Sequence, residues 1–163
     1  MSSEKTEASL FAMTAETSAS RVAFSYESMA FAAHAILTPH RLDVPSRNAF
    51  VDSFVVHSRR LLAFFIDDPT HATDLVVADV VGSVPEISLE VVAAERINMN
   101  RRVLHLTTDQ TTDLVTWPVS GMAKELREAF ESLVHQMAHE ESDHLPRFEE
   151  ALNQIPGFEK LTR

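Results

Sequence analysis

Glycine is scarce in this sequence: only Gly82, Gly121 and Gly157 occur among 163 residues. Sandwiches and barrels of β-strands need many tight turns, and glycine is the residue that enters turn conformations most readily. The scarcity therefore predicts a helical fold. It also excludes glycine-rich phosphate loops, because neither the dinucleotide-binding pattern nor the Walker pattern can be written with these three positions.

Hydrophobic periodicity predicts four long helices, over roughly 20–38, 46–67, 85–106 and 118–142, and a short fifth helix from Pro146. Pro39 should end the first helix, and Ser46 is the expected N-cap of the second. Residues 69–84 are expected to be a loop with at most one helical turn. The predicted fold is all-α, an antiparallel four-helix bundle with a short C-terminal helix. Residues 1–19 are expected to be a flexible or partly helical tail, and residues 20–163 a single bundle domain.

Composition limits the possible partners and surroundings. The formal net charge of −10 repels duplex DNA and anionic lipid, so any RNA or nucleotide must bind at a local basic patch. There is no cysteine, which favours a reducing compartment, and the first 20 residues lack the pattern of a secretory signal. No stretch approaches about 18 apolar residues, so a membrane span is not expected. We therefore expect a cytoplasmic protein.

The stretch "RINMNRRVLHLTT", residues 96–108, has three arginines and a histidine but no acid. On a helical wheel, Asn98, Arg101 and His105 share one stripe and Arg102 lies beside it, whereas a second, apolar stripe should face the core. That second stripe contains Val92, Met99, Val103 and Leu106.

Two interpretations of the polar stripe stay open. The backbone dipole favours cations in the last turn of any helix, so the arginines could be structural. Alternatively, Arg and His converge on an anion, since Arg binds phosphate bidentately and His can transfer a proton near neutral pH. The second interpretation predicts Asn98, Arg101, Arg102 and His105 as anion-binding residues. His57 of the second helix joins them, and Arg101 and His105 are also candidate catalytic residues.

Two resemblances bear on this stretch. The run "RNAFVDSFVVHSRRLLAFF", then "RINMNRRVLHLT" and then "TWP" resembles a group of uncharacterised bacterial helical proteins over roughly residues 46–135. That group implies no activity. More distantly, the chain is similar to the HEPN superfamily, whose members are helical bundles, often dimeric and often RNA-cleaving. In their motif four to six residues separate Arg from His, whereas here three residues separate Arg101 from His105 and eight separate Arg96 from His105.

The run "HQMAHEESDH" raises the question of a metal site. His135 and His139 are four residues apart, so both could bind one ion. Together with His57 they are similar to DinB-type bundles, which implies a divalent metal such as Zn or Ni. The helical wheel, however, predicts that both histidines face water beside Glu128 and Glu131, while His57 faces the core. A solvated face is thus expected, and no cofactor.

Three function hypotheses follow. The first is a binding protein with an HEPN-like anion or RNA contact at the end of the third helix, the second a DinB-like metal-dependent enzyme, and the third a structural or regulatory helical protein. Whether the protein is an enzyme stays open. A homodimer is expected, because the first helix is apolar on most sides and the chain has ten phenylalanines.

Overall fold

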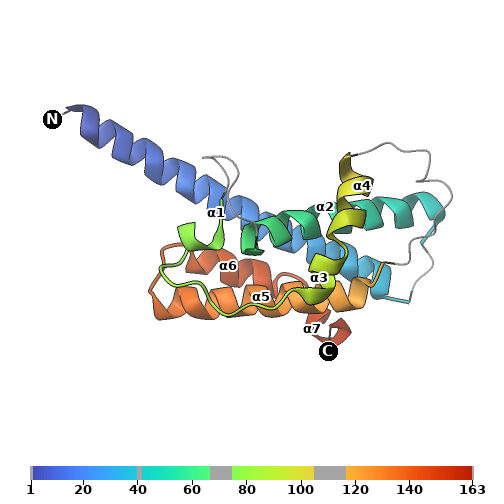
Figure 1. Ribbon diagram of the computed structural model, residues 1–163. Coiled ribbons are helices and arrows are strands. Elements are labelled where there is room, and N and C mark those ends of the chain that lie inside the picture. Colours follow the sequence, from blue (N-terminus) through green and yellow to red (C-terminus); the bar gives the residue numbers. More distant parts are fainter. Residues whose placement is uncertain (1, 40–41, 67–74, 105–116, 163) are drawn as a thin grey trace.

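The computed structural model describes residues 2–39, 42–66, 75–104 and 117–162, with side chains described from Ala19 and not for residues 102–104 (Figure 1). All regular elements of these residues are helical, so the all-α class is confirmed. They are α1 (Ser2–Leu37), α2 (Val44–Ile66), the 3-10 turn η1 (Val77–Asp79), α3 (Glu90–Ala94), α4 (Arg96–Leu104), α5 (Val119–His139), α6 (Leu145–Asn153) and α7 (Phe158–Leu161).

Helix α1 is the longest element and packs along α2, α5 and α6. Its buried surface consists largely of small residues, and Ala23, Ala32 and Ala33 have no exposed area. Such residues let neighbouring helix backbones approach closely. The helix starts at Ser2, so residues 2–19 continue it, and its N-terminal part extends beyond the other helices in Figure 1.

Helix α2 begins two residues earlier than predicted, and its N-terminal cap is not Ser46. The carboxylate of Asp43 accepts a hydrogen bond from the Ser46 amide at 2.7 Å, which is the geometry of an Asp N-cap. Hydrogen bonds from Ser46 also lower the pKa of Asp43. Asp43, which precedes a first turn that contains proline, was therefore a better sequence signal for the start of α2 than Ser46.

The predicted third helix over 85–106 is wrong in its first part and in its continuity. Residues 84–89 have no regular structure, and α3 starts at Glu90. The helix is interrupted by a turn at Glu95, after which α4 begins. The amide of Glu95 bonds to the carbonyl of Val92, a tighter i→i−3 turn. A carboxylate of α5 fixes the start of α3: Glu125 accepts hydrogen bonds from the amides of Val91 and Val92 at 2.9 and 3.0 Å.

A second carboxylate, just after α5, holds the segment that leads to α3. Glu140 accepts hydrogen bonds from the amides of Gly82 at 2.6 Å and Ser83 at 3.0 Å. The side chain of Gln136 bonds to both Glu140 and Ser83. The bond from Gln136 and those from the two amides lower the pKa of Glu140 to about 2. As predicted, residues 75–84 are a connection with a single helical turn, η1.

A stack of three aromatic rings joins α1, α5 and α6 in the core. The ring centroids of Tyr26 and Phe130 are 3.9 Å apart, those of Phe130 and Phe148 are 5.2 Å apart, and both interplanar angles are 12°. Each of the three side chains is at most 1% exposed. Burial of such rings is among the largest favourable contributions that single side chains make to folding.

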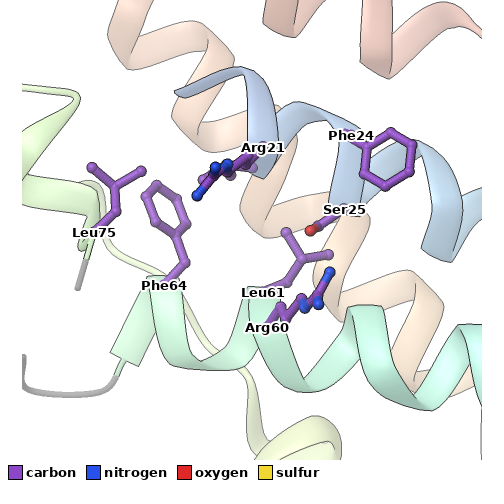
Figure 2. Close-up of a pocket in the computed structure, with 8 residues that line it drawn as sticks. Arg21, Phe24, Ser25, Arg60, Leu61, Phe64 and Leu75 are labelled. Carbon is purple, nitrogen blue, oxygen red and sulfur yellow. The ribbon is translucent and has the colours of Figure 1, made fainter. Parts of the chain in front are cut away.

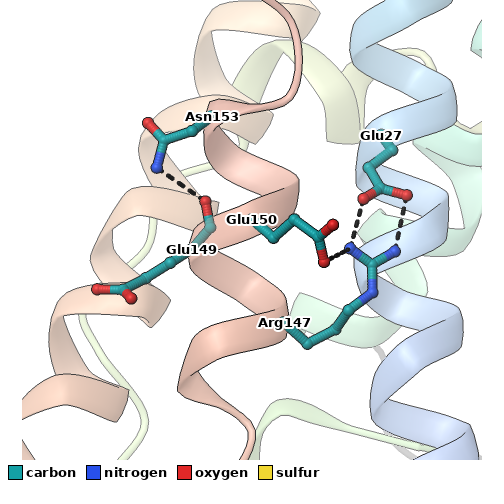
Figure 3. A network of polar contacts seen from close by, with 5 residues as sticks. All are labelled: Glu27, Arg147, Glu149, Glu150 and Asn153. Atoms are coloured by element: carbon teal, nitrogen blue, oxygen red, sulfur yellow. Dashed lines mark hydrogen bonds and ion pairs between the residues drawn. The ribbon is translucent and has the colours of Figure 1, made fainter.

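An ion pair at the edge of this core ties α6 to α1. Arg147 donates to both carboxylate oxygens of Glu27, at 2.8 Å for the Nη2–Oε2 pair, and reaches Glu150 at 3.4 Å (Figure 3). The hydrogen bonds to Glu27 raise the pKa of Arg147. A bidentate pair of this kind fixes the orientation of α6 as well as its position.

Removing the Tyr26 hydroxyl should leave stability unchanged or increase it. The hydroxyl is buried, and it has no hydrogen-bond partner among the described residues. Tyr26→Phe should therefore not lower the free energy of unfolding, whereas Tyr26→Ala should lower it by about 3–5 kcal/mol. Urea unfolding followed by circular dichroism measures both. A loss above about 1 kcal/mol in Tyr26→Phe would show that the hydroxyl is hydrogen-bonded.

Candidate functional site

The arginine-rich stretch forms α4, which crosses α2 steeply in Figure 1 and packs on it. Residues 96–104 contain Arg96, Arg101 and Arg102 and no acidic residue. Arg96 and Arg101 are exposed. A short helix with three cations thus lies on the surface of a chain whose net charge is −10.

A hydrogen bond between side chains connects α2 to α4. Arg59 donates through Nε to Oδ1 of Asn100 at 2.8 Å. Both side chains are partly buried. The bond adds an arginine of a second helix to the basic stretch. Sequence reasoning missed Arg59, although the pair of cations in "HSRRLL" on an otherwise apolar helix was a signal for it.

Asn98 has a partner one turn earlier in the chain. Its Nδ2 donates to Oε2 of Glu95 at 2.8 Å, across the break between α3 and α4. The core-facing stripe is confirmed for Val92 and Met99, both fully buried. Val103 and Leu106, the other two members, lie outside the residues whose side chains are described.

The remaining predicted residues of this site are only partly described. Arg101 is exposed near the end of α4. The backbone of Arg102 belongs to α4, but its side chain lies outside the described ones, and His105 lies outside the described residues altogether. A meeting of Asn98, Arg101 and His105 around one ligand therefore stays a prediction.

His57 faces α1 instead of α4. Its half-buried ring makes an edge contact with Phe24, with centroids 5.7 Å apart. Two residues along a helix are about 200° apart, so His57 and Arg59 leave α2 on opposite sides. The Nδ1 atom of His57 is buried and has no hydrogen-bond partner among the described residues. Burial, and to a smaller extent the charge of Arg60, lowers the pKa of His57.

The last long helix carries the two histidines of the metal alternative. Both His135 and His139 are exposed on α5, as the helical wheel predicted, and Arg127 pairs with Glu131 on the same helix. In the part of the chain that the structure describes, no three His, Cys, Asp or Glu side chains are placed to hold one metal ion.

No family model, no curated protein and no solved structure matches this chain. The resemblances to the uncharacterised helical group and to HEPN-type bundles therefore stay predictions. Across the described residues, no helix combines the length and the apolar character that crossing a membrane requires.

The protonation of His57 should respond to Arg60. We expect an NMR titration to give His57 a pKa below 6.5, and Arg60→Gln to raise it, because one positive neighbour is removed. Arg47→Gln, an exposed position in the first turn of α2, is the control. A histidine with a lowered pKa stabilises the fold fully above pH 6.5, and its contribution falls as pH drops below that value. A His57 pKa above 6.5 would contradict the burial of the ring.

Proposed function

We propose that this protein is a helical binding protein whose contact with an anion, RNA phosphate above all, lies where α4 crosses α2. The residues that would make the contact are Arg59, Asn98, Arg101, Arg102 and His105, of which Arg101 and His105 stay candidate catalytic residues. Whether a reaction follows binding is open. The cytoplasmic location also stays a prediction.

The hydrogen bond between Arg59 and Asn100 carries this proposal. It anchors a guanidinium of α2 beside α4, and a guanidinium has a planar fork of five donors that suits phosphate geometry. Arginines from two helices on one surface are the usual footprint of a nucleic-acid contact in a chain that is acidic elsewhere.

The dipole explanation of the arginines accounts for only part of the pattern. It favours Arg101 and Arg102 near the C-terminal end of α4, but Arg96 is the first residue of α4, where the dipole disfavours a cation. It also does not concern Arg59, which belongs to α2. The exposed positions of His135 and His139, with His57 facing α1, favour the anion contact over the DinB-like metal alternative.

We propose that the helices are arranged as an antiparallel four-helix bundle, as the sequence predicts. Helices α1, α2 and α5 are three of its four members, and α3 together with α4 takes the place of the fourth helix.

We further propose a homodimer. An exposed phenylalanine supports it: Phe31 of α1 is 59% exposed and makes an edge contact with the partly buried Phe50 of α2, with centroids 5.8 Å apart. Exposed apolar patches of this kind mark protein interfaces.

Removing two arginines of α4 should weaken RNA binding without unfolding the protein. We expect Arg101→Ala with Arg102→Ala to raise the Kd for a fluorescent single-stranded RNA about tenfold or more, measured by anisotropy. The slope of log K against log salt should fall by about 0.7 for each phosphate that the variant no longer neutralises. The free energy of unfolding should stay within about 1 kcal/mol of wild type.

A control with the same change in charge separates a local contact from general electrostatics. Arg47→Ala with Lys160→Ala removes two exposed cations of α2 and α7 and should leave RNA binding within about twofold. If both double variants weakened RNA binding equally, the result would contradict the proposed contact. Absence of RNA binding by the wild-type protein would do the same, and loss of folding in the Arg101 and Arg102 variant would show a structural role.

The homodimer should depend on Phe31. Size-exclusion chromatography with light scattering is expected to give a dimer for the wild type and a monomer for Phe31→Asp, because a carboxylate cannot be buried unpaired at an apolar interface. Val84→Asp introduces the same charge at another exposed apolar position, 54% exposed, and should leave the dimer intact. A monomeric wild type would refute the dimer.

A further inference from the structure

A groove lies between α1 and α2, on a different part of α2 from the contact with α4. It has a volume of about 550 Å³ and is partly open to solvent. Figure 2 shows the side chains that line it. Arg21 and Phe24 of α1 line it, together with Arg60, Leu61 and Phe64 of α2. Leu75, which follows α2 in the described chain, lines it as well.

The walls of the groove combine apolar side chains with the hydroxyl of Ser25, beside the two arginines. Phe64 and Leu61 are buried core residues that are at most 4% exposed and form its base, whereas Phe24 is 55% exposed at its edge and supplies most of the accessible aromatic surface. Pockets that hold small organic molecules have volumes of about 300–1,000 Å³ and walls of this character. The groove is therefore large enough for an alkyl chain or an aromatic ring system.

Two cations border this groove, and no carboxylate of the described residues pairs with either of them. The guanidinium groups of Arg21 and Arg60 are exposed, and neither has a hydrogen bond or an ion pair with any residue that the structure describes. By contrast, Arg127 and Arg147 each bind a carboxylate of this acidic chain. An anion between Arg21 and Arg60 would supply the negative charge that the described residues do not place there.

We propose that the groove between α1 and α2 binds a small anionic amphiphile: an apolar body against Phe24, Phe64 and Leu61, and a carboxylate or phosphate group between Arg21 and Arg60. The apolar walls distinguish this site from the RNA contact at α4, since a phosphodiester chain needs a row of cations and polar surroundings. The ligand is a single molecule with one charged end, and its binding does not depend on the function proposed above.

Fluorescence titration tests the site with 8-anilinonaphthalene-1-sulfonate, an aromatic anion, as the probe. We expect saturable binding at one site per chain, and displacement by dodecanoate and by dodecyl phosphate. The relative strength of these two competitors separates a carboxylate from a phosphate head group. Dodecyltrimethylammonium has the same tail with a positive head and should displace the probe about tenfold less effectively, because like charges repel.

Variants of exposed residues locate the binding. Arg21→Gln with Arg60→Gln should weaken binding of the probe and of dodecanoate about tenfold, and Phe24→Ala about threefold. The controls are Arg47→Gln and Val84→Ala, which are an exposed arginine and an exposed apolar residue outside the groove and should change affinity less than about twofold. Circular dichroism confirms that each variant is folded.

Backbone amide NMR of the wild-type protein gives a readout that needs no variant. Dodecanoate should shift the resonances of Arg21, Arg60 and Phe64 and leave those of α4 unchanged. Shifts confined to α4 or scattered over the surface would overturn the proposal. So would equal displacement by the anionic and the cationic amphiphile, or unchanged affinity in the double arginine variant.

Discussion

The stacked rings of Tyr26, Phe130 and Phe148 are the contact on which the rest of the structure depends. They bring together three helices that are far apart in the sequence, and their area is removed from water almost completely. With α1, α5 and α6 fixed by this contact, the pair between Arg147 and Glu27 only has to set the angle of α6. Of the remaining helices, α2 and α7 pack against α1, and α3 packs against α5.

Helix α5 and the residue that follows it position the candidate site from a distance, through two carboxylates. Glu140 holds the turn at Gly82 and Ser83, and Glu125 binds the amides at the start of α3. Each carboxylate satisfies backbone donors that would otherwise face water or remain unpaired. The segment that these two carboxylates hold leads through α3 into α4, whose Asn100 accepts the hydrogen bond from Arg59 of α2.

The cations of α2 lie in two different surroundings, and this difference decides what each could bind. Arg59 is held by Asn100 on the arginine-rich side, where α4 offers polar and charged neighbours. Arg60, the next residue, points to the groove beside α1, where Phe24 and Phe64 form apolar walls. Adjacent residues of a helix point about 100° apart, so two neighbouring arginines can serve an extended polyanion and a compact amphiphile separately.

The sequence alone determined the helical class, the end of α1 before Pro39, the approximate bounds of α2, α5 and α6, and the exposed histidines of α5, because these depend on local periodicity and on helix-ending residues. Tertiary structure alone decided the break at Glu95, the use of Glu125 as a cap, the partnership of Arg59 with Asn100 and the groove beside Arg60. The last three of these features join residues that are distant in the sequence, and the interruption at Glu95 directly follows the segment of α3 whose amides Glu125 binds. Helical periodicity describes the face on which a side chain lies, but not which distant carboxylate or amide will meet it.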